Sequence, residues 1–182
     1  MAYYPNIPLY AGIYIQTPDD ELMVDIREAF GVVVKSHAIP YGIKPKEPYR
    51  NDWHDEHGDD EYIGSTQYME AFTFTEECVI ITKERYSVDA RQKLCDQMMA
   101  FRNYLFRGEF NFYDTYTWKG FQKVRVSEFP IPSSDDYDVF NGKARLIFSV
   151  TLKVNDPVTE MMIEDDRIVP ADDALRQVRR AF

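Results

Sequence analysis

The chain of 182 residues lacks several features that mark secreted, membrane-spanning or redox-active proteins. Its first ten residues, MAYYPNIPLY, contain neither a basic start nor an apolar core, and no apolar run approaches membrane-spanning length. The two cysteines, Cys78 and Cys95, fall in apolar patterns without a metal-type CxxC spacing, and no Asn-x-Ser/Thr acceptor occurs. We therefore expect a soluble protein made in a cytoplasm, with reduced core thiols and no membrane partner.

Positive charge is also scarce, because 21 basic residues face 31 acidic ones and the net charge is -10. This balance argues against a protein that grips nucleic acid through its phosphates. No Gly/Ser linker divides the chain, and 45% hydrophobic content is enough for one sizeable core. We expect a single domain over residues 1–182.

Hydrophobic periodicity is clearest in the second half of the chain. Residues 143–154 alternate apolar and polar side chains, which predicts a strand with one buried face, and residues 68–83 predict a second strand that is sheltered on both faces at its far end. Between them, residues 88–107 repeat apolar side chains at helical spacing after a capping serine. The predicted helix buries Leu94, Met98, Phe101 and Leu105, together with Cys95 and Phe106.

The remaining segments predict shorter elements. Residues 109–116 and 122–129 indicate a hairpin around the turn TWKG, which ends in Gly120, and a polar loop follows over residues 130–142. Strands are expected at residues 9–15 and 31–38, whereas residues 17–30 fit either a capped helix or a loop that feeds a strand.

Two segments are expected to extend from the body. Residues 40–62 form a long charged loop with several prolines, and residues 157–182 form a C-terminal arm that ends in a short helix candidate. The economical fold is mainly β (α+β): an antiparallel β-barrel or sandwich with one long helix packed on its flank, because the helix and the alternating strand each have one apolar face to hide.

The stretch NDWHDEHGDDEY, residues 51–62, is the candidate for a metal site, since it holds His54 and His57 among six carboxylates. A zincin needs histidines four apart with a glutamate directly after the first, whereas these are three apart and Asp55 follows the first. An EF-hand loop with its glycine at Gly58 would have Trp53 at its first position and His57 at its fifth, where oxygen ligands are required. We therefore interpret the stretch as a structural acidic loop without a bound metal.

Other catalytic patterns are weaker. No phosphate loop, GxSxG or dinucleotide fingerprint occurs, and cysteines on core faces are more often packing residues than nucleophiles, even with His37 available. The carboxylate pairs Asp135–Asp136 and Asp165–Asp166 lie in loops without an apolar setting. The sequence thus predicts no catalytic residues, no cofactor and no enzyme.

Several segments together resemble a known family: WHDEHGDDEYI, the helix after KERYSVDARQKL, the strand GEFNFYDTY and the closing ARLIFSVTLKVNDPVTEM. Over roughly residues 10–160 they resemble tail proteins encoded by phages and prophages of gut bacteria, of the tail-tube, distal-tail and tail-terminator type. The resemblance implies a β-barrel or sandwich that assembles into rings around the DNA channel. It implies a virion tail location, assembly in the bacterial cytoplasm, and partners among other tail proteins.

A ring subunit needs surfaces that fit its neighbours, and the extending segments carry suitable anchors. The predicted oligomer interface comprises Tyr49, Trp53, Tyr62, Leu175, Val178 and Phe182. By analogy with tail tubes the expected partner is the chain itself, as a homo-oligomeric ring such as a hexamer, and DNA passes through the anionic lumen without specific contact. The alternatives are a metal-dependent enzyme built on His54 and His57, and a monomeric head–tail adaptor.

Overall fold

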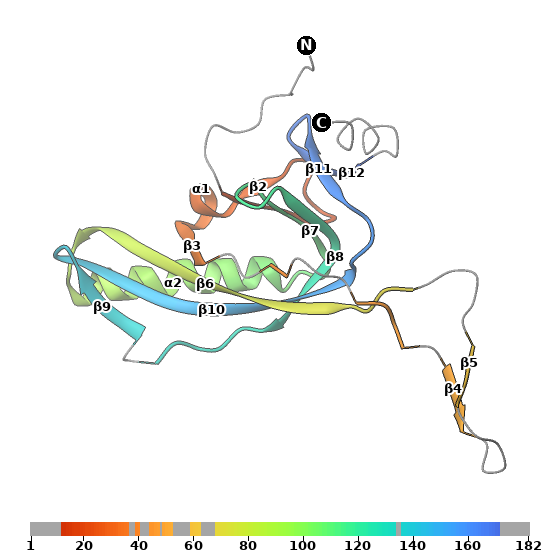
Figure 1. Cartoon of the computed structure of the whole chain (residues 1–182). Helices are drawn as coiled ribbons and strands as arrows, with labels where there is room; N and C mark the ends of the chain where they lie inside the picture. Colours follow the sequence, from red (N-terminus) through yellow and green to blue (C-terminus); the bar gives the residue numbers. More distant parts are fainter. Residues whose placement is uncertain are drawn as a thin grey trace.

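The structure is a computed structural model that describes residues 12–36, 39–40, 44–47, 49–52, 59–62, 68–133 and 136–171. Two helices and twelve strands lie in these ranges, and Figure 1 labels them. Their bounds are β1 Ile13–Gln16, β2 Val24–Asp25, α1 Ile26–Phe30, β3 Val32–Ser36, β4 Tyr49–Asp52, β5 Asp59–Tyr62, β6 Phe72–Arg85, α2 Val88–Leu105, β7 Phe110–Asp114, β8 Lys119–Glu128, β9 Tyr137–Phe140, β10 Lys143–Asp156, β11 Met161–Glu164 and β12 Arg167–Pro170.

The main sheet is antiparallel and has eight strands in the order β2-β1-β7-β8-β10-β6-β3, with β9 beside β10. It curls into a half-barrel, and α2 packs on its flank against β6 and β10 (Figure 1). The predicted fold class is therefore confirmed. The apolar faces of the helix and of the sheet meet in one large core.

Strand β10 forms because its side chains alternate, and its even-numbered residues from Ala144 to Val154 are all buried. It pairs along most of its length with β6, where Phe148 lies opposite Cys78. Strand β6 begins at Phe72, so Tyr68 lies outside it and is 69% exposed. Ile81 is 41% exposed, so the prediction that the far end of this strand is sheltered on both faces is wrong.

Helix α2 begins where predicted, because the Ser87 hydroxyl accepts a hydrogen bond from the Ala90 N–H at 3.1 Å. The four side chains that the helical spacing selected, Leu94, Met98, Phe101 and Leu105, are buried against the sheet. The helix ends at Leu105, and Phe106 is 54% exposed beside Arg102. The predicted burial of Phe106 is therefore wrong.

The β7–β8 turn lies at residues 115–118, two residues earlier than predicted, and Trp118 adopts a left-handed conformation with φ 55°. Gly120 is therefore part of β8. A Cβ at this position would lie 2.5 Å from Tyr113 Cδ2 and 2.7 Å from Met161 Cβ. Gly120 is needed for the close approach of β11 to the sheet, and it does not form the turn.

Residues 17–30, for which the sequence allows a capped helix or a loop that feeds a strand, contain a turn, a short strand and a short helix. A turn follows β1, and β2 then pairs with β1 through Tyr14 opposite Asp25. Asp25 caps α1, since its carboxylate accepts a hydrogen bond from the Arg27 N–H at 2.7 Å. The helix thus starts at Ile26, nine residues after the cap that the sequence suggested at Thr17.

The two expected extensions contain hairpins. Within residues 40–62, β4 and β5 pair in a separate two-stranded sheet, which lies apart from the half-barrel in Figure 1. Within residues 157–182, β11 and β12 pair and pack on the sheet, where Met161 and Ile168 cover Tyr14 and Tyr113 in a second small core. Residues 172–182 lie outside the described residues.

Candidate interaction surfaces

The predicted interface residues are only partly described. Tyr49 begins β4 and Tyr62 ends β5, and the two lie opposite each other in the hairpin register. The other four, Trp53, Leu175, Val178 and Phe182, lie outside the described residues. The structure thus brings one predicted pair together and leaves the interface itself a prediction.

The metal alternative has the same limit, because His54 and His57 lie outside the described residues. Among the residues that are described, no three His, Cys, Asp or Glu side chains lie together as they would to hold a metal ion. Cys78 is 2% exposed on the inner face of β6, and burial raises the pKa of its thiol, with Glu76 and Glu77 adding to the effect. This thiol is therefore a poor nucleophile.

Two partly buried carboxylates, Asp20 and Asp156, hold turns. Asp20 accepts hydrogen bonds at one oxygen, Oδ2, from the Thr17 N–H at 3.0 Å, the Thr17 hydroxyl at 2.6 Å and the Tyr104 hydroxyl at 2.6 Å. Burial works to raise the pKa of Asp20, but these hydrogen bonds outweigh it and the pKa lies below its usual range. For Tyr104, burial and the bond to Asp20 both raise the pKa. The contact ties the turn after β1 to the end of α2.

Asp156, at the end of β10, also holds a turn by accepting hydrogen bonds. Its carboxylate accepts hydrogen bonds from Gln122 Nε2 at 2.7 Å and from the backbone N–H groups of Val158 and Thr159. Burial works against ionisation, yet these donors lower the pKa of Asp156. The arrangement turns the chain from β10 into the β11–β12 hairpin, so it is structural.

One hollow of about 370 Å³ lies between the turn after β1 and the start of β12. It is lined by both signs of charge, with Asp20 and Glu109 facing Lys123 and Arg167. Glu109 already accepts a hydrogen bond from Asn155 at 3.0 Å, and Asp20 is held by its three donors. This mixed lining selects no particular ligand.

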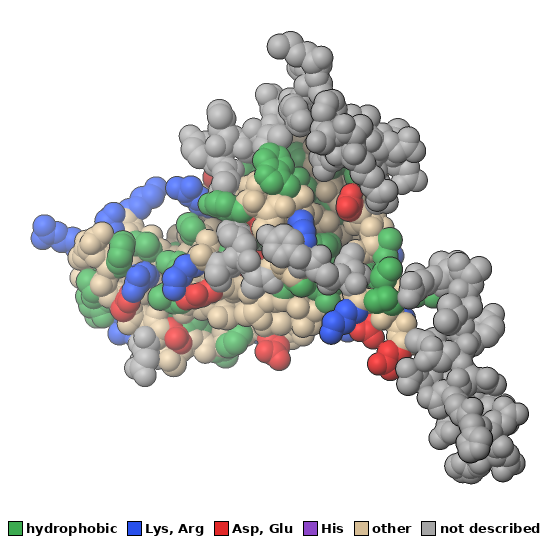
Figure 2. All heavy atoms as spheres, viewed as in Figure 1, with side chains coloured by type: hydrophobic (Ala, Val, Ile, Leu, Met, Phe, Trp, Pro, Cys, Tyr) green, Lys and Arg blue, Asp and Glu red, His purple; other side chains and the backbone are tan. Residues whose placement is uncertain are grey.

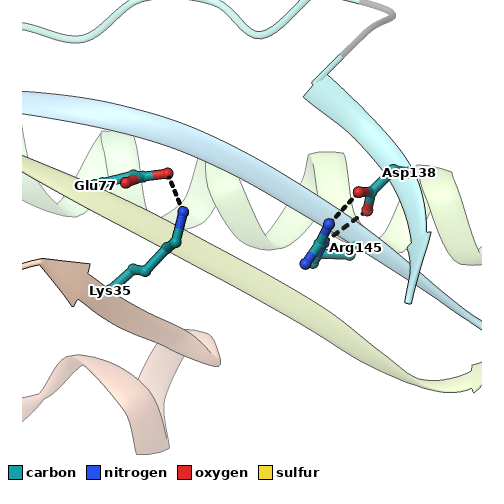
Figure 3. A network of polar contacts seen from close by, with 4 residues as sticks. All are labelled: Lys35, Glu77, Asp138 and Arg145. Atoms are coloured by element: carbon teal, nitrogen blue, oxygen red, sulfur yellow. Dashed lines mark hydrogen bonds and ion pairs between the residues drawn. The ribbon is translucent and has the colours of Figure 1, made fainter. Parts of the chain in front are cut away.

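The outer face of the sheet, opposite the main core, carries an apolar row where β3, β6 and β10 meet. Val33, Val79 and Ile147 lie side by side in register, and Val33 is 45% exposed. Two ion pairs involve residues two positions along the same three strands, and Figure 3 draws both pairs: Lys35 Nζ lies 2.8 Å from Glu77 Oε1, and Arg145 pairs with Asp138. An apolar centre with a charged rim is typical of a protein-binding surface.

Among the described residues, the two end strands of the sheet have one unpaired side each. In the described part of the chain, β2 and β3 each pair on one side only, and they form the two edges of the sheet. Edge strands present unpaired N–H and C=O groups and are templates for a strand of another chain.

Charge is unevenly distributed over the surface. Lys83, Arg85 and Lys143, here called the basic tip, are exposed where β6 ends and β10 begins. Figure 2 shows Lys and Arg side chains gathered at this end of the molecule. The register places Arg85 directly opposite Lys143. Sequence reasoning missed this cluster, because its members lie 58 residues apart and meet only through the β6–β10 register.

Comparison with known proteins adds no family. No protein-family model matches the chain, and neither the curated proteins nor the solved structures give a significant match. Within the described ranges, no helix combines the length and the apolar character needed to cross a membrane. The surfaces above are suited to recognition between proteins.

Proposed function

We propose that the chain is a non-enzymatic structural subunit of a bacteriophage or prophage tail, located in the virion tail at the tube, distal-tail or terminator level. The observation that carries this proposal is the open half-barrel with two edge strands and a separate β4–β5 hairpin (Figure 1). A ring subunit needs two different patches that fit each other, and this architecture offers edges at both ends of one sheet.

The resemblance of the sequence to phage tail proteins supports the same role. In this role the chain assembles with itself into a ring, such as a hexamer, around the DNA channel. The net charge of -10 favours a lumen that DNA passes without sticking, because carboxylates repel phosphates.

The experiment is immunogold electron microscopy of the phage or prophage particles, combined with reconstruction of tails produced from the neighbouring genes. The proposal expects the chain in the tail as a closed ring with contacts between its copies. Absence from the tail would overturn the proposal. Presence as isolated copies would favour the head–tail adaptor, and stoichiometric metal lost on changing His54 and His57 would favour the metal-dependent enzyme.

A further inference from the structure

The basic tip concentrates positive charge in a protein whose net charge is -10. Arg85 lies opposite Lys143 in the β6–β10 register, and Lys83 is two residues before Arg85 on β6. Among the residues that the structure describes, none of these three side chains makes an ion pair. Like charges in opposed positions of an antiparallel pair are unfavourable, so a carboxylate supplied from outside would stabilise this end of the sheet.

The neighbouring carboxylates on β6 and β9 are already paired. Glu84, beside Arg85, pairs with Lys93 of α2 at 2.5 Å. On β9, Asp138 pairs with Arg145 of β10 (Figure 3). The positive charge of the tip is therefore not balanced from within the strands that carry it.

Exposed apolar side chains accompany these cations. Phe140 lies opposite Lys143 in the β9–β10 register and is 44% exposed. The guanidinium of Arg145 packs on the Phe140 ring, with its Cζ 5.0 Å from the ring centroid. The Tyr86 N–H donates to the Gly142 carbonyl at 2.9 Å, which ties the end of β6 to the β9–β10 turn. The other exposed large apolar side chains here are Tyr86, Val88 and Val139.

The apolar row on the outer face of the sheet continues toward the tip. Ile81 follows the row residue Val79 at the next outward position of β6, lies opposite Arg145 and is 41% exposed. From Val79 to Arg85 the strand extends about 20 Å. One docking segment can therefore cover apolar side chains at one end of this surface and cations at the other. We call the surface from the row to the tip the row–tip surface.

This combination fits a protein segment better than nucleic acid or a lipid surface. DNA and anionic membranes are extended polyanions, and the net charge of -10 repels them as a whole. A segment of a folded protein can bring a few carboxylates to the tip together with apolar side chains for the row. An apolar centre with charged residues at its margin, and aromatic side chains beside arginine, are typical of protein interfaces.

We propose that the row–tip surface docks a segment of a different tail protein in which carboxylates lie beside apolar side chains. The carboxylates pair with the tip, and the apolar side chains cover Ile81 and the row. The tip lies where β6 and β10 meet, away from the edge strands β2 and β3 that the proposed ring uses between copies, so it is left for another protein. This inference names a partner for the tail subunit proposed above and rests on that proposal.

Photochemical cross-linking identifies the partner. p-Benzoylphenylalanine replaces Phe140 in the full chain, which is produced with the neighbouring tail genes. The matched control carries it in place of Trp118, another exposed aromatic residue, in the β7–β8 turn. Irradiated tails should contain a product that joins position 140 to an acidic and apolar segment of a different tail protein, and the control should not give this product. A product with a second copy, DNA or lipid alone, or no product in tails that contain the chain, would overturn the inference.

Charge reversal tests the cations of the tip. The tip variant is Arg85→Glu/Lys143→Glu, in which one like-charge pair replaces another. The matched control is Arg125→Glu/Lys153→Glu, which reverses a second pair of opposed cations in the same sheet and changes the net charge equally. Circular dichroism compares the fold of both variants with the parent.

Binding to the purified cross-linked partner is measured by isothermal titration calorimetry. The tip variant should bind at least about tenfold more weakly than the control, because a like-charge contact replaces a favourable one. A partner whose carboxylates in the cross-linked segment are changed to lysine should bind the tip variant better than it binds the parent. Equal affinities of the tip variant and the control, or no such rescue by a folded partner, would overturn the inference.

Salt separates the two halves of the contact. The affinity of the parent should fall as the sodium chloride concentration rises, because exposed ion pairs are screened, and the tip variant should lose this dependence. Phe140→Ala should weaken binding by about tenfold and keep the salt dependence of the parent, because it removes an aromatic contact and no charge. An unchanged affinity of Phe140→Ala would contradict the apolar contact.

The same tails separate this inference from the proposed function. Tails that contain the chain as a ring, with position 140 joined to no other tail protein, would leave the function standing and refute the docking. A chain that is absent from tails but is joined through position 140 to an acidic segment of another protein would refute the function alone. Absence from tails without any product would refute both.

Discussion

At the scale of single residues, positions that look similar in sequence have different roles. Gly120 and Gly142 both follow turn-like stretches, yet only Gly142 has a left-handed backbone, with φ 73°, next to Asn141. Gly120 lies in β8 under the β11–β12 hairpin, where its lack of a side chain allows close contact. The difference depends on β11, which is about 40 residues away in sequence and is not visible in the local pattern.

We predict that Gly120→Ala destabilises the protein by about 1–3 kcal/mol, because its Cβ would overlap Tyr113 and Met161 and force the hairpin away from the sheet. Ser127→Ala on the same strand is exposed and serves as the control. The measurement is the free energy of unfolding in urea of both variants and the parent. Equal values for the two variants would mean that β11 does not pack where the structure places it.

We also predict that Asp20→Asn costs about 1–3 kcal/mol at neutral pH, since charge-assisted hydrogen bonds from Thr17 and Tyr104 are weakened. The pKa of Asp20 is lowered in the folded state, so its contribution is present above the unfolded value, about 3.9, and is lost as the pH falls through the folded value. The stability difference between parent and variant should therefore shrink below about pH 4. The matched control is Asp19→Asn, which changes an exposed neighbour.

At the scale of elements, the sequence predicts the long helix and strands that have a clear hydrophobic period. It does not predict the short strands that form by pairing with a neighbour. The alternation in β10 and the helical spacing in α2 identify both elements and their buried faces. Strand β9 and the β11–β12 hairpin lie in segments that the sequence predicts as a loop and an arm, because a strand of four residues is too short to show a clear hydrophobic period. The turn residues Asn141–Gly142 and Asp165–Asp166, all with positive φ, are the available signal for these hairpins.

The helix face provides a sharp prediction with a neighbour as control. Met98 is 2% exposed and Met99 is 37% exposed, so Met98→Asp buries a charge without a partner whereas Met99→Asp does not. We expect Met98→Asp to lose several kcal/mol, out of a total stability of about 5–15 kcal/mol, and to be largely unfolded. Near-ultraviolet circular dichroism and thermal unfolding of both variants would measure this difference in folding and stability. Equal melting temperatures would mean that the helix presents another face to the sheet.

At the scale of the whole molecule, positive charge gathers at the basic tip, where β6 ends and β10 begins (Figures 1 and 2). This cluster is not evident in the sequence, because Arg85 and Lys143 become neighbours only in the folded sheet. The acidic stretch at residues 51–62 is predictable from composition, whereas the basic tip requires the register of β6 with β10.

The C-terminal region gives a prediction at this scale. A chain that stops after Ala171 keeps both the large and the small core and should fold with the stability of the parent. We predict that it fails to assemble because it lacks Leu175, Val178 and Phe182. A chain that stops after Thr159 also loses Met161 and Ile168, which cover Tyr14 and Tyr113. It should be less stable by about 3–6 kcal/mol.

Urea unfolding and sedimentation of the two truncated chains distinguish folding from assembly. Normal assembly of the chain that stops after Ala171 would exclude the last segment from the interface. A chain that stops after Thr159 with parental stability would mean that the β11–β12 hairpin contributes nothing to the fold.

The exposed turn between β7 and β8 carries a tryptophan whose fluorescence can report on assembly. The chain has two tryptophans, and Trp118 in this turn is 56% exposed. With Trp53→Phe, the intrinsic fluorescence comes from Trp118 alone and should have the red-shifted emission of an indole in water. A neighbouring copy that covered the turn would shift that emission to the blue, so the time course of assembly could be followed by stopped-flow mixing without attaching a dye.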